Sequence, residues 1–135
     1  MGAVIAIDLG PKKSGFASTD PTHIATSVLE PVRAQPMSAA FMEHLEALIE
    51  ERRPDTLLIG LPLDEDGTEG RQTAYVRDTA EQLGRRYPDK RVLLYDERYT
   101  SKAAEDLIRE SGIPRSEVKR VRDSFAALVL SLIHI

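Results

Sequence analysis

The sequence of 135 residues contains no cysteine. Disulfides, thiolate metal ligands and cysteine nucleophiles are therefore excluded, and packing alone must hold the fold. The N-terminus has no basic leader and Asp8 interrupts its apolar run, so we expect neither a signal peptide nor a membrane anchor. Low-complexity tracts and internal repeats are also missing. These absences predict a single packed domain spanning residues 1–135, located in the cytoplasm.

Positive charge is also scarce, because 18 Lys and Arg residues face 22 Asp and Glu residues and give a net charge of −4. This balance argues against a protein that coats nucleic acid nonspecifically, since such binding depends on neutralising phosphates. A local basic groove remains compatible with it. The densest group of basic residues lies between Arg115 and Arg122, although such a group taken alone is usually a solvated surface.

The periodicity of apolar residues predicts the secondary structure. Strands are predicted at Ala3 to Leu9, at FAST after the GPKKSG turn, at Ile24 to Leu29, at Thr56 to Gly60 and at Arg91 to Asp96. Helices are predicted from the cap Ser38 to Pro54, around Val76 to Tyr87, from Lys102 to Glu110 and from Asp123 onward. The opening strands form an antiparallel meander, whereas strands separated by helices pair in parallel through right-handed crossovers. We therefore expect an α/β fold with a mixed five-stranded sheet, its first three strands antiparallel, flanked by helices on both faces.

Acidic residues stand where apolar strands end. Asp8 interrupts the run AVIAIDL, and a carboxylate there is costly unless it sits at the strand's end and meets a partner. Asp96 and Glu97 follow VLLY at the carboxyl end of another strand, where open α/β sheets place their ligands. Because side chains alternate along a strand, only one of this pair faces a given side. We favour Glu97 as the ligand and Asp96 as a residue that supports it.

Asp123 opens the last predicted helix, where taken alone it is a helix N-cap. Strand ends and helix starts can converge in a mixed sheet, so Asp8, Glu97 and Asp123 could share one site. Three close carboxylates would raise one another's pKa unless a cation neutralised them. Oxygen-only ligands favour Mg²⁺ or Mn²⁺, and a pair of such ions can promote hydrolysis of a phosphodiester without a covalent intermediate.

Four segments, in order along the chain, carry a resemblance to a known family. They are IAIDLGPKKSGFASTD at 5–20, LIGLPLDEDGTEG at 58–70, LYDERYTSKAAE at 94–105 and RDSFAALVL at 122–130. Together they resemble the YqgF/RuvX family of ribonuclease H-like, Holliday-junction-resolvase-like proteins. The resemblance implies a ribonuclease H-like fold, a nuclease role in maturing the end of pre-16S ribosomal RNA, and resolution of branched DNA as an additional role. It also implies that Asp8, Glu97 and Asp123 are the catalytic acids.

Basic residues close to these acids in the sequence are candidates for contacts with the substrate. They are Lys12, Lys13, Arg71, Arg98, Lys102 and Arg122. Lys13 stands where the family often has Arg, and a lysine lacks the bidentate grip of a guanidinium on phosphate. The expected partner is nucleic acid, either structured RNA or branched DNA, bound at a basic rim. A junction resolvase should also be a two-fold homodimer, although no motif marks a dimer face.

Two other functions stay open. The AIDLGPKKSG segment also looks like the phosphate hairpin of actin-like ATPases and sugar kinases, but those proteins need two lobes, and the chain has no Walker lysine motif. A non-catalytic module that binds ribosomal or transcription machinery would retain the acids for folding, since a fold does not fix a function. Tight ATP binding would favour the first alternative, and absence of metal-dependent cleavage would favour the second.

Overall fold

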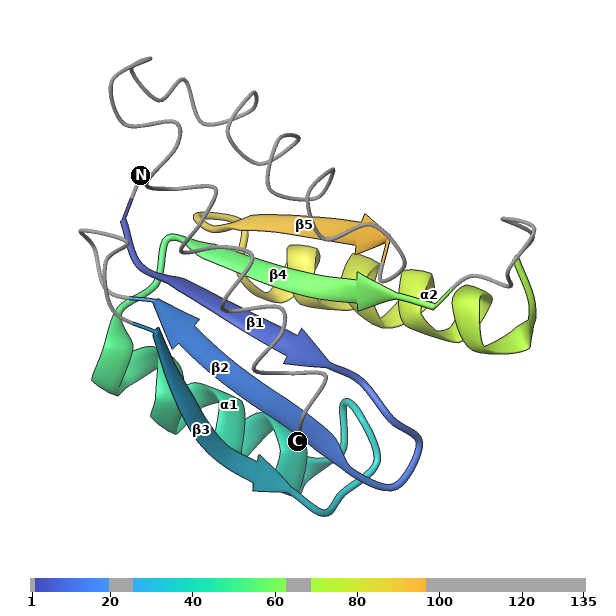
Figure 1. The fold of residues 1–135 in the computed structure, drawn as a ribbon, viewed down its shortest axis with the longest axis horizontal. Helices are drawn as coiled ribbons and strands as arrows, with labels where there is room; N and C mark the ends of the chain where they lie inside the picture. The colour runs from blue at the N-terminus through green and yellow to red at the C-terminus, as the bar shows by residue number, and fades with distance from the viewer. Residues whose placement is uncertain (1, 20–25, 63–68, 97–135) are drawn as a thin grey trace.

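The computed structural model describes residues 2–19, 26–62 and 69–96. These residues form the elements β1 (Val4–Asp8), β2 (Ser14–Thr19), β3 (Thr26–Val32), α1 (Ala39–Arg52), β4 (Thr56–Leu61), α2 (Arg71–Arg86) and β5 (Arg91–Asp96), as Figure 1 shows. The helices predicted from Lys102 and from Asp123 lie outside the described residues.

The strands form one five-stranded sheet in the order β3-β2-β1-β4-β5. β1 pairs antiparallel with β2, and β2 pairs antiparallel with β3, whereas β1, β4 and β5 are parallel. The predicted mixed sheet is therefore confirmed. The arrowheads of β1, β4 and β5 point to the same side in Figure 1, so Asp8, Leu61 and Asp96 end the three parallel strands at one edge, which we call the carboxyl edge.

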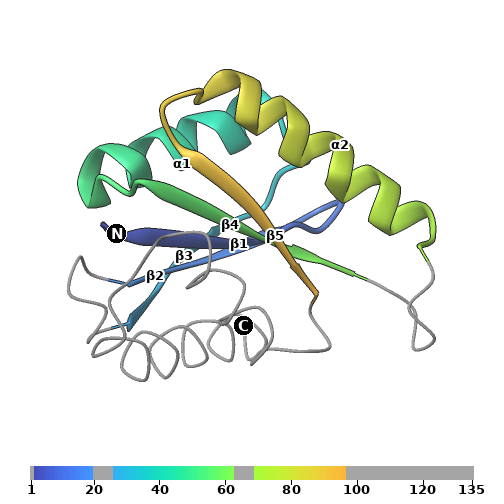
Figure 2. The same cartoon turned by 90° about the horizontal axis from the view of Figure 1, so that it is seen from above.

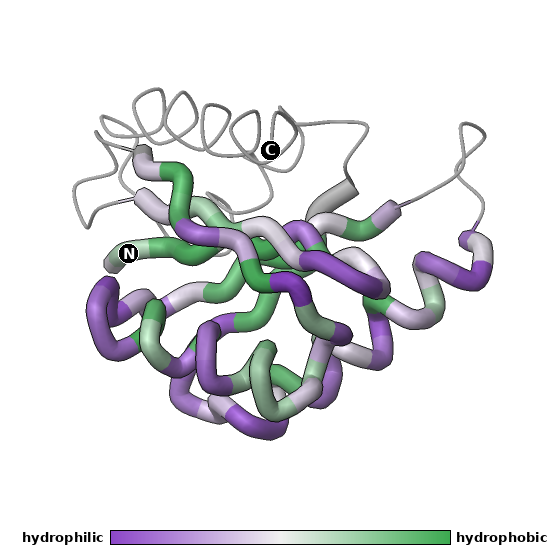
Figure 3. The backbone as a smooth tube through the Cα atoms, turned by 90° about the horizontal axis from the view of Figure 1, so that it is seen from below, coloured by the Kyte–Doolittle hydropathy of each residue, from purple (hydrophilic) through white to green (hydrophobic). Residues whose placement is uncertain are grey.

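Both described helices pack on the same face of the sheet (Figure 2). The residues buried between the helices and the sheet are Ile5, Ile7, Leu9, Phe16, Leu29, Phe41, Leu45, Leu48, Leu57, Ile59, Leu61, Val76, Ala80 and Leu83. Hydrophobic residues accordingly dominate the strands, while hydrophilic stretches recur along the helices (Figure 3). Within the described ranges, neither helix is long and apolar enough to cross a membrane.

The ends of α1 follow local signals in the sequence. The Ser38 hydroxyl accepts a hydrogen bond from the Phe41 backbone N–H at 3.2 Å, which caps the helix start. Arg53 ends the helix in a left-handed conformation with φ of 47°, immediately before Pro54, which cannot continue a helix. The predicted cap and stop of this helix are both confirmed.

The predicted bounds of β3 were wrong, because this strand runs to Val32 and includes Pro31. β3 lies at the edge of the sheet, where a residue without a backbone N–H can be accommodated. Its pairing with β2 also shifts register between Ser14 and Phe16, which leaves one extra residue on the β3 side. Proline therefore did not end the strand, since it falls at an irregular position of an edge strand.

Candidate active site

Asp8 is the exposed last residue of β1, after four buried residues. Ile5 and Ile7 belong to the core under the helices, so the alternation of the strand places Asp8 on the opposite face. No hydrogen bond or ion pair joins its carboxylate to the rest of the described chain. Although the side chain reaches solvent, surrounding protein removes enough water to raise the pKa of Asp8 above its ordinary value of 3.8. A carboxylate in this condition is suited to bind a cation.

The register of the parallel strands relates Asp8 to the end of β5. Ile7 pairs with Ile59, so Asp8 lies level with Gly60, and Leu61 pairs with Asp96. Two strand spacings put the backbones of Asp8 and Asp96 roughly 10 Å apart. The structure thus brings two of the predicted acids to the carboxyl edge.

The turn between β1 and β2 carries Lys12 and Lys13, both exposed. Asp8 and Gly15 are paired residues at the base of this turn. The turn is tight, because a Cβ added to Gly10 would overlap the carbonyl oxygen of Lys13. The short turn that carries the two lysines therefore starts and ends next to the paired residues Asp8 and Gly15.

The start of α2 is tied to the end of β4 by Thr73, a residue that the sequence did not single out. Its buried hydroxyl accepts a hydrogen bond from the Gly70 N–H at 3.2 Å and donates one to the carbonyl of Pro62. Arg71, the predicted substrate contact, is the exposed first residue of this helix. The only local signal for Thr73 is a hydroxyl residue in the first turn after a glycine.

Five predicted site residues lie outside the described ranges, and they are Glu97, Arg98, Lys102, Arg122 and Asp123. Within the described ranges, no group of three or more His, Cys, Asp and Glu side chains could hold a metal. A site in which Asp8 and two further side chains of these types hold a metal would therefore need at least one residue from beyond these ranges.

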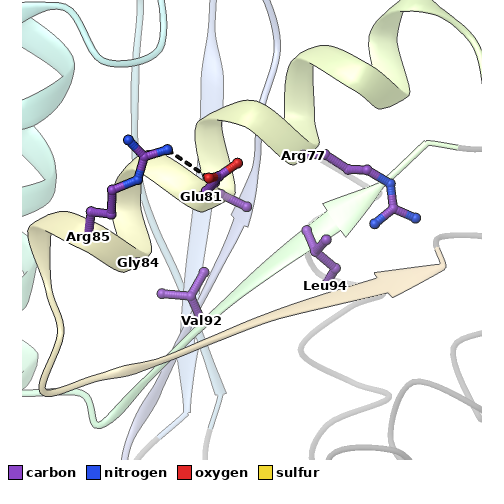
Figure 4. Close-up of a pocket in the computed structure, with 7 residues that line it drawn as sticks. Arg77, Glu81, Gly84, Arg85, Val92 and Leu94 are labelled. Atoms are coloured by element: carbon purple, nitrogen blue, oxygen red, sulfur yellow. Dashed lines mark hydrogen bonds and ion pairs between the residues drawn. The ribbon is translucent and has the colours of Figure 1, made fainter.

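A groove of about 540 Å³ lies between α2 and β5. Figure 4 shows its lining, with the Arg85 guanidinium paired to the Glu81 carboxylate across the helix surface at 2.7 Å. Val92 and Leu94 of β5 border it on the side of the sheet that the helices cover. Asp8 lies on the other face, so this groove is separate from Asp8.

The topology with an acid at the carboxyl edge defines a ribonuclease H-like fold. It matches RuvC of T. thermophilus, solved in complex with Holliday junction substrate, with a TM-score of 0.50 and 17% identity over 96% of this chain and 91% of that chain. Among relatives by sequence, a Maridesulfovibrio salexigens protein is 38% identical over 127 residues, which are 94% of this chain and 93% of its own. One from Streptomyces avermitilis is 34% identical over 96% of this chain and 82% of its own.

Both relatives carry the name "Putative pre-16S rRNA nuclease". A family model described as "RuvX: Holliday junction resolvase" matches residues 2–131. The chain therefore belongs to the RuvX family, as the four sequence segments indicated.

Proposed function

We propose that this protein is a nuclease of the cytoplasm that uses divalent metal ions to hydrolyse phosphodiester bonds in pre-16S ribosomal RNA. The observation that carries the proposal is the Asp8 carboxylate at the carboxyl edge. Its pKa is raised, and it has no hydrogen bond or ion pair to the described residues. Membership of the RuvX family and the names of its relatives support hydrolysis of nucleic acid. Branched DNA is the second candidate substrate, supported by the resolvase description of the family.

The proposed metal ligands are Asp8, Glu97 and Asp123. Even-numbered positions of β1 and β4 share a face of the sheet with odd-numbered positions of β5, since Ala6 pairs with Leu58 and Leu58 pairs with Leu93. Asp8 therefore shares its face with odd-numbered positions of β5, and Glu97 is the next odd-numbered residue in the sequence. This numbering supports Glu97 over Asp96 as the proposed partner of Asp8. Carboxylate oxygens suit Mg²⁺ or Mn²⁺, and two such ions would activate a water molecule and stabilise the leaving oxygen.

The proposed contacts with phosphate are the basic residues around these acids. Lys12 and Lys13 lie in the turn beside Asp8, and Arg71 begins α2. The first turn of α2 has no acidic residue, and the helix dipole disfavours a cation such as Arg71 at this end. A bound phosphate would compensate that repulsion. Arg98, Lys102 and Arg122 are proposed for the same role from their sequence positions next to Glu97 and Asp123.

The two candidate substrates, precursor RNA and branched DNA, place different requirements on the oligomeric state of the protein. Symmetric cutting of a four-way junction requires a two-fold dimer with one site in each subunit. Cleavage at one end of an RNA precursor needs only one subunit. We therefore expect a homodimer only if branched DNA is the substrate.

The test compares cleavage of a precursor RNA containing the 16S end with cleavage of a four-way DNA junction, each with Mg²⁺ or Mn²⁺. Asp8→Asn, Glu97→Gln and Asp123→Asn are each expected to stay folded by circular dichroism and to lose at least about 100-fold in cleavage rate, because even residues that support metal ligands typically contribute 10–100-fold. The matched control is Asp89→Asn, an exposed residue in the turn before β5, which should cleave like the wild type.

The nuclease proposal fails if the wild type cleaves neither substrate with either metal, or if the triple variant cleaves as fast as the wild type. Tight ATP binding without cleavage would instead support the kinase-like alternative.

A further inference from the structure

Thr73 joins two elements through one side chain. Its Oγ1 donates to the carbonyl of Pro62, the residue after β4, and accepts from the N–H of Gly70, the N-cap of α2. Thr73 is only 1% exposed, so water does not compete for these hydrogen bonds. The hydroxyl therefore fixes the first turn of α2 against the end of β4.

A second contact at this helix start involves Glu69, whose carboxylate pairs with the Arg77 guanidinium. Both side chains are about half exposed, at 49% and 50%. Surface ion pairs of this kind contribute little because water and salt screen them. The buried hydroxyl of Thr73 is thus the stronger of the two restraints on the helix start.

The restraint acts on Arg71, which lies between Gly70 and Thr73 in the sequence. β4 is the direct neighbour of β1, and Pro62 lies two positions beyond Gly60, the residue level with Asp8. Holding Pro62 and Gly70 on one hydroxyl therefore fixes the backbone of Arg71 relative to the carboxyl edge.

Thr79 shows what an ordinary buried threonine does in the same helix. Its Oγ1 donates to the Tyr75 carbonyl one turn earlier at 3.0 Å, and the residue is 3% exposed. This hydrogen bond stays within α2 and connects it to no other element. The contrast assigns a role in placing α2 to Thr73 and not to Thr79.

We propose that Thr73 is a positioning residue that holds Arg71 where its guanidinium binds a phosphate of the nucleic-acid substrate. This role rests on the proposed nuclease function. The hydroxyl itself does not touch the substrate, so its removal should weaken substrate binding through Arg71 and leave the acids proposed as metal ligands in place.

The experiment measures kcat and KM for cleavage by Thr73→Val, Thr73→Ser, Arg71→Ala and the matched control Thr79→Val. Thr73→Val should raise KM by about 10-fold with little change in kcat, since a hydrogen-bonded phosphate contact is worth roughly this factor. Thr73→Ser keeps the hydroxyl and should restore the wild-type KM. Thr79→Val should leave KM unchanged. Thr73→Ala, which cannot overpack, replaces the valine variant if the latter does not fold.

The double variant with Arg71→Ala gives the decisive comparison. If Thr73 acts through Arg71, Thr73→Val adds no further increase in KM once Arg71 is gone. Two results would overturn the positioning role while leaving the nuclease function intact. One is that Thr73→Val raises KM as much in the Arg71→Ala variant as in the wild type, and the other is that Thr73→Val alone has the wild-type KM. A wild-type chain that cleaves neither substrate would overturn the nuclease function and this role with it.

Discussion

Two aspartates lie at opposite ends of the parallel strands and meet different surroundings. Asp55, just before β4, accepts hydrogen bonds from the Gly2 backbone N–H at 2.5 Å and from the Thr56 hydroxyl at 2.9 Å. Asp8, at the carboxyl edge, has no hydrogen bond or ion pair to its carboxylate within the described residues, and burial raises its pKa. The fold therefore supplies hydrogen-bond donors to the Asp55 carboxylate, and the described residues supply none to the Asp8 carboxylate.

The backbone of Asp55 adds to the difference. Its N–H donates to the Ala3 carbonyl at 3.0 Å, and its carbonyl accepts from the Arg91 N–H at 2.9 Å. Asp55 therefore connects the beginnings of β1, β4 and β5. The acid at one end is therefore bonded to the sheet, whereas the acid at the other end is the one proposed to bind a metal ion.

The largest expected effect on stability separates these two acids directly. Asp55→Ala removes two hydrogen bonds and leaves the buried Thr56 hydroxyl without this partner, so it should lower the free energy of unfolding by about 1–3 kcal/mol. Asp8→Asn should not lower it at neutral pH without metal. Urea denaturation of both variants in a chelating buffer measures the difference.

The raised pKa of Asp8 determines whether folding stability rises or falls with pH. Its folded pKa lies above 3.8, so the fold disfavours the ionised form, and the wild type loses stability as pH rises from below 3.8 through the raised value. Asp8→Asn lacks this loss. An equal destabilisation by Asp8→Asn and Asp55→Ala at pH 7 would remove the distinction between the two acids.

A smaller effect on stability is expected at the turn that carries the two lysines. Gly10→Ala places a Cβ against the Lys13 carbonyl oxygen, so the turn must shift at a cost of about 1–2 kcal/mol, and substrate affinity should fall because the lysines move. Gly84→Ala is the matched control, because nothing lies within 4 Å of its added Cβ. In the helix interior this change should stabilise by about 0.5–1 kcal/mol. Similar melting temperatures for both variants would contradict the tight turn.

The smallest effect on stability is expected at the start of α2, where stability and function should move in opposite directions. Arg71→Glu puts a negative charge in a helix first turn that has no acid, which should stabilise by about 0.5 kcal/mol. The same change should raise KM, because it repels phosphate. Arg71→Gln should give an intermediate KM. A charge reversal that leaves KM unchanged would remove Arg71 from the substrate contacts.

The sequence predicted those parts of the fold that have local signals. The Ser38 cap, the stop at Pro54 and the bounds of β5 from Arg91 to Asp96 are confirmed because each depends on residues close together in the chain. The end of β3 was wrong because the sequence does not show which strand lies at an edge, and an edge strand tolerates Pro31.

In the site, too, the sequence predicted what depends on neighbouring residues and missed contacts between separate elements. Asp8 was found because a carboxylate interrupts an apolar strand, and its position at the carboxyl edge is confirmed. The contact between Asp55 and Gly2 was missed because these residues are 53 positions apart in the chain. The hydrogen bond from Thr73 to Pro62 was missed because it joins a helix to the end of a strand across a loop. Hydroxyl and carboxylate side chains carry no sequence signal for partners that only the tertiary fold supplies.

The most direct test of the account is the effect of Mn²⁺ on the melting temperature of the wild type, Asp8→Asn and Asp55→Ala, without substrate. Binding to the folded state stabilises by about 2.7 kcal/mol at 100 times the dissociation constant. The melting temperatures of the wild type and Asp55→Ala should therefore rise with Mn²⁺, the latter from a lower starting value, while that of Asp8→Asn should stay constant. A rise for Asp8→Asn equal to that of the wild type would contradict the assignment of Asp8 as a metal ligand.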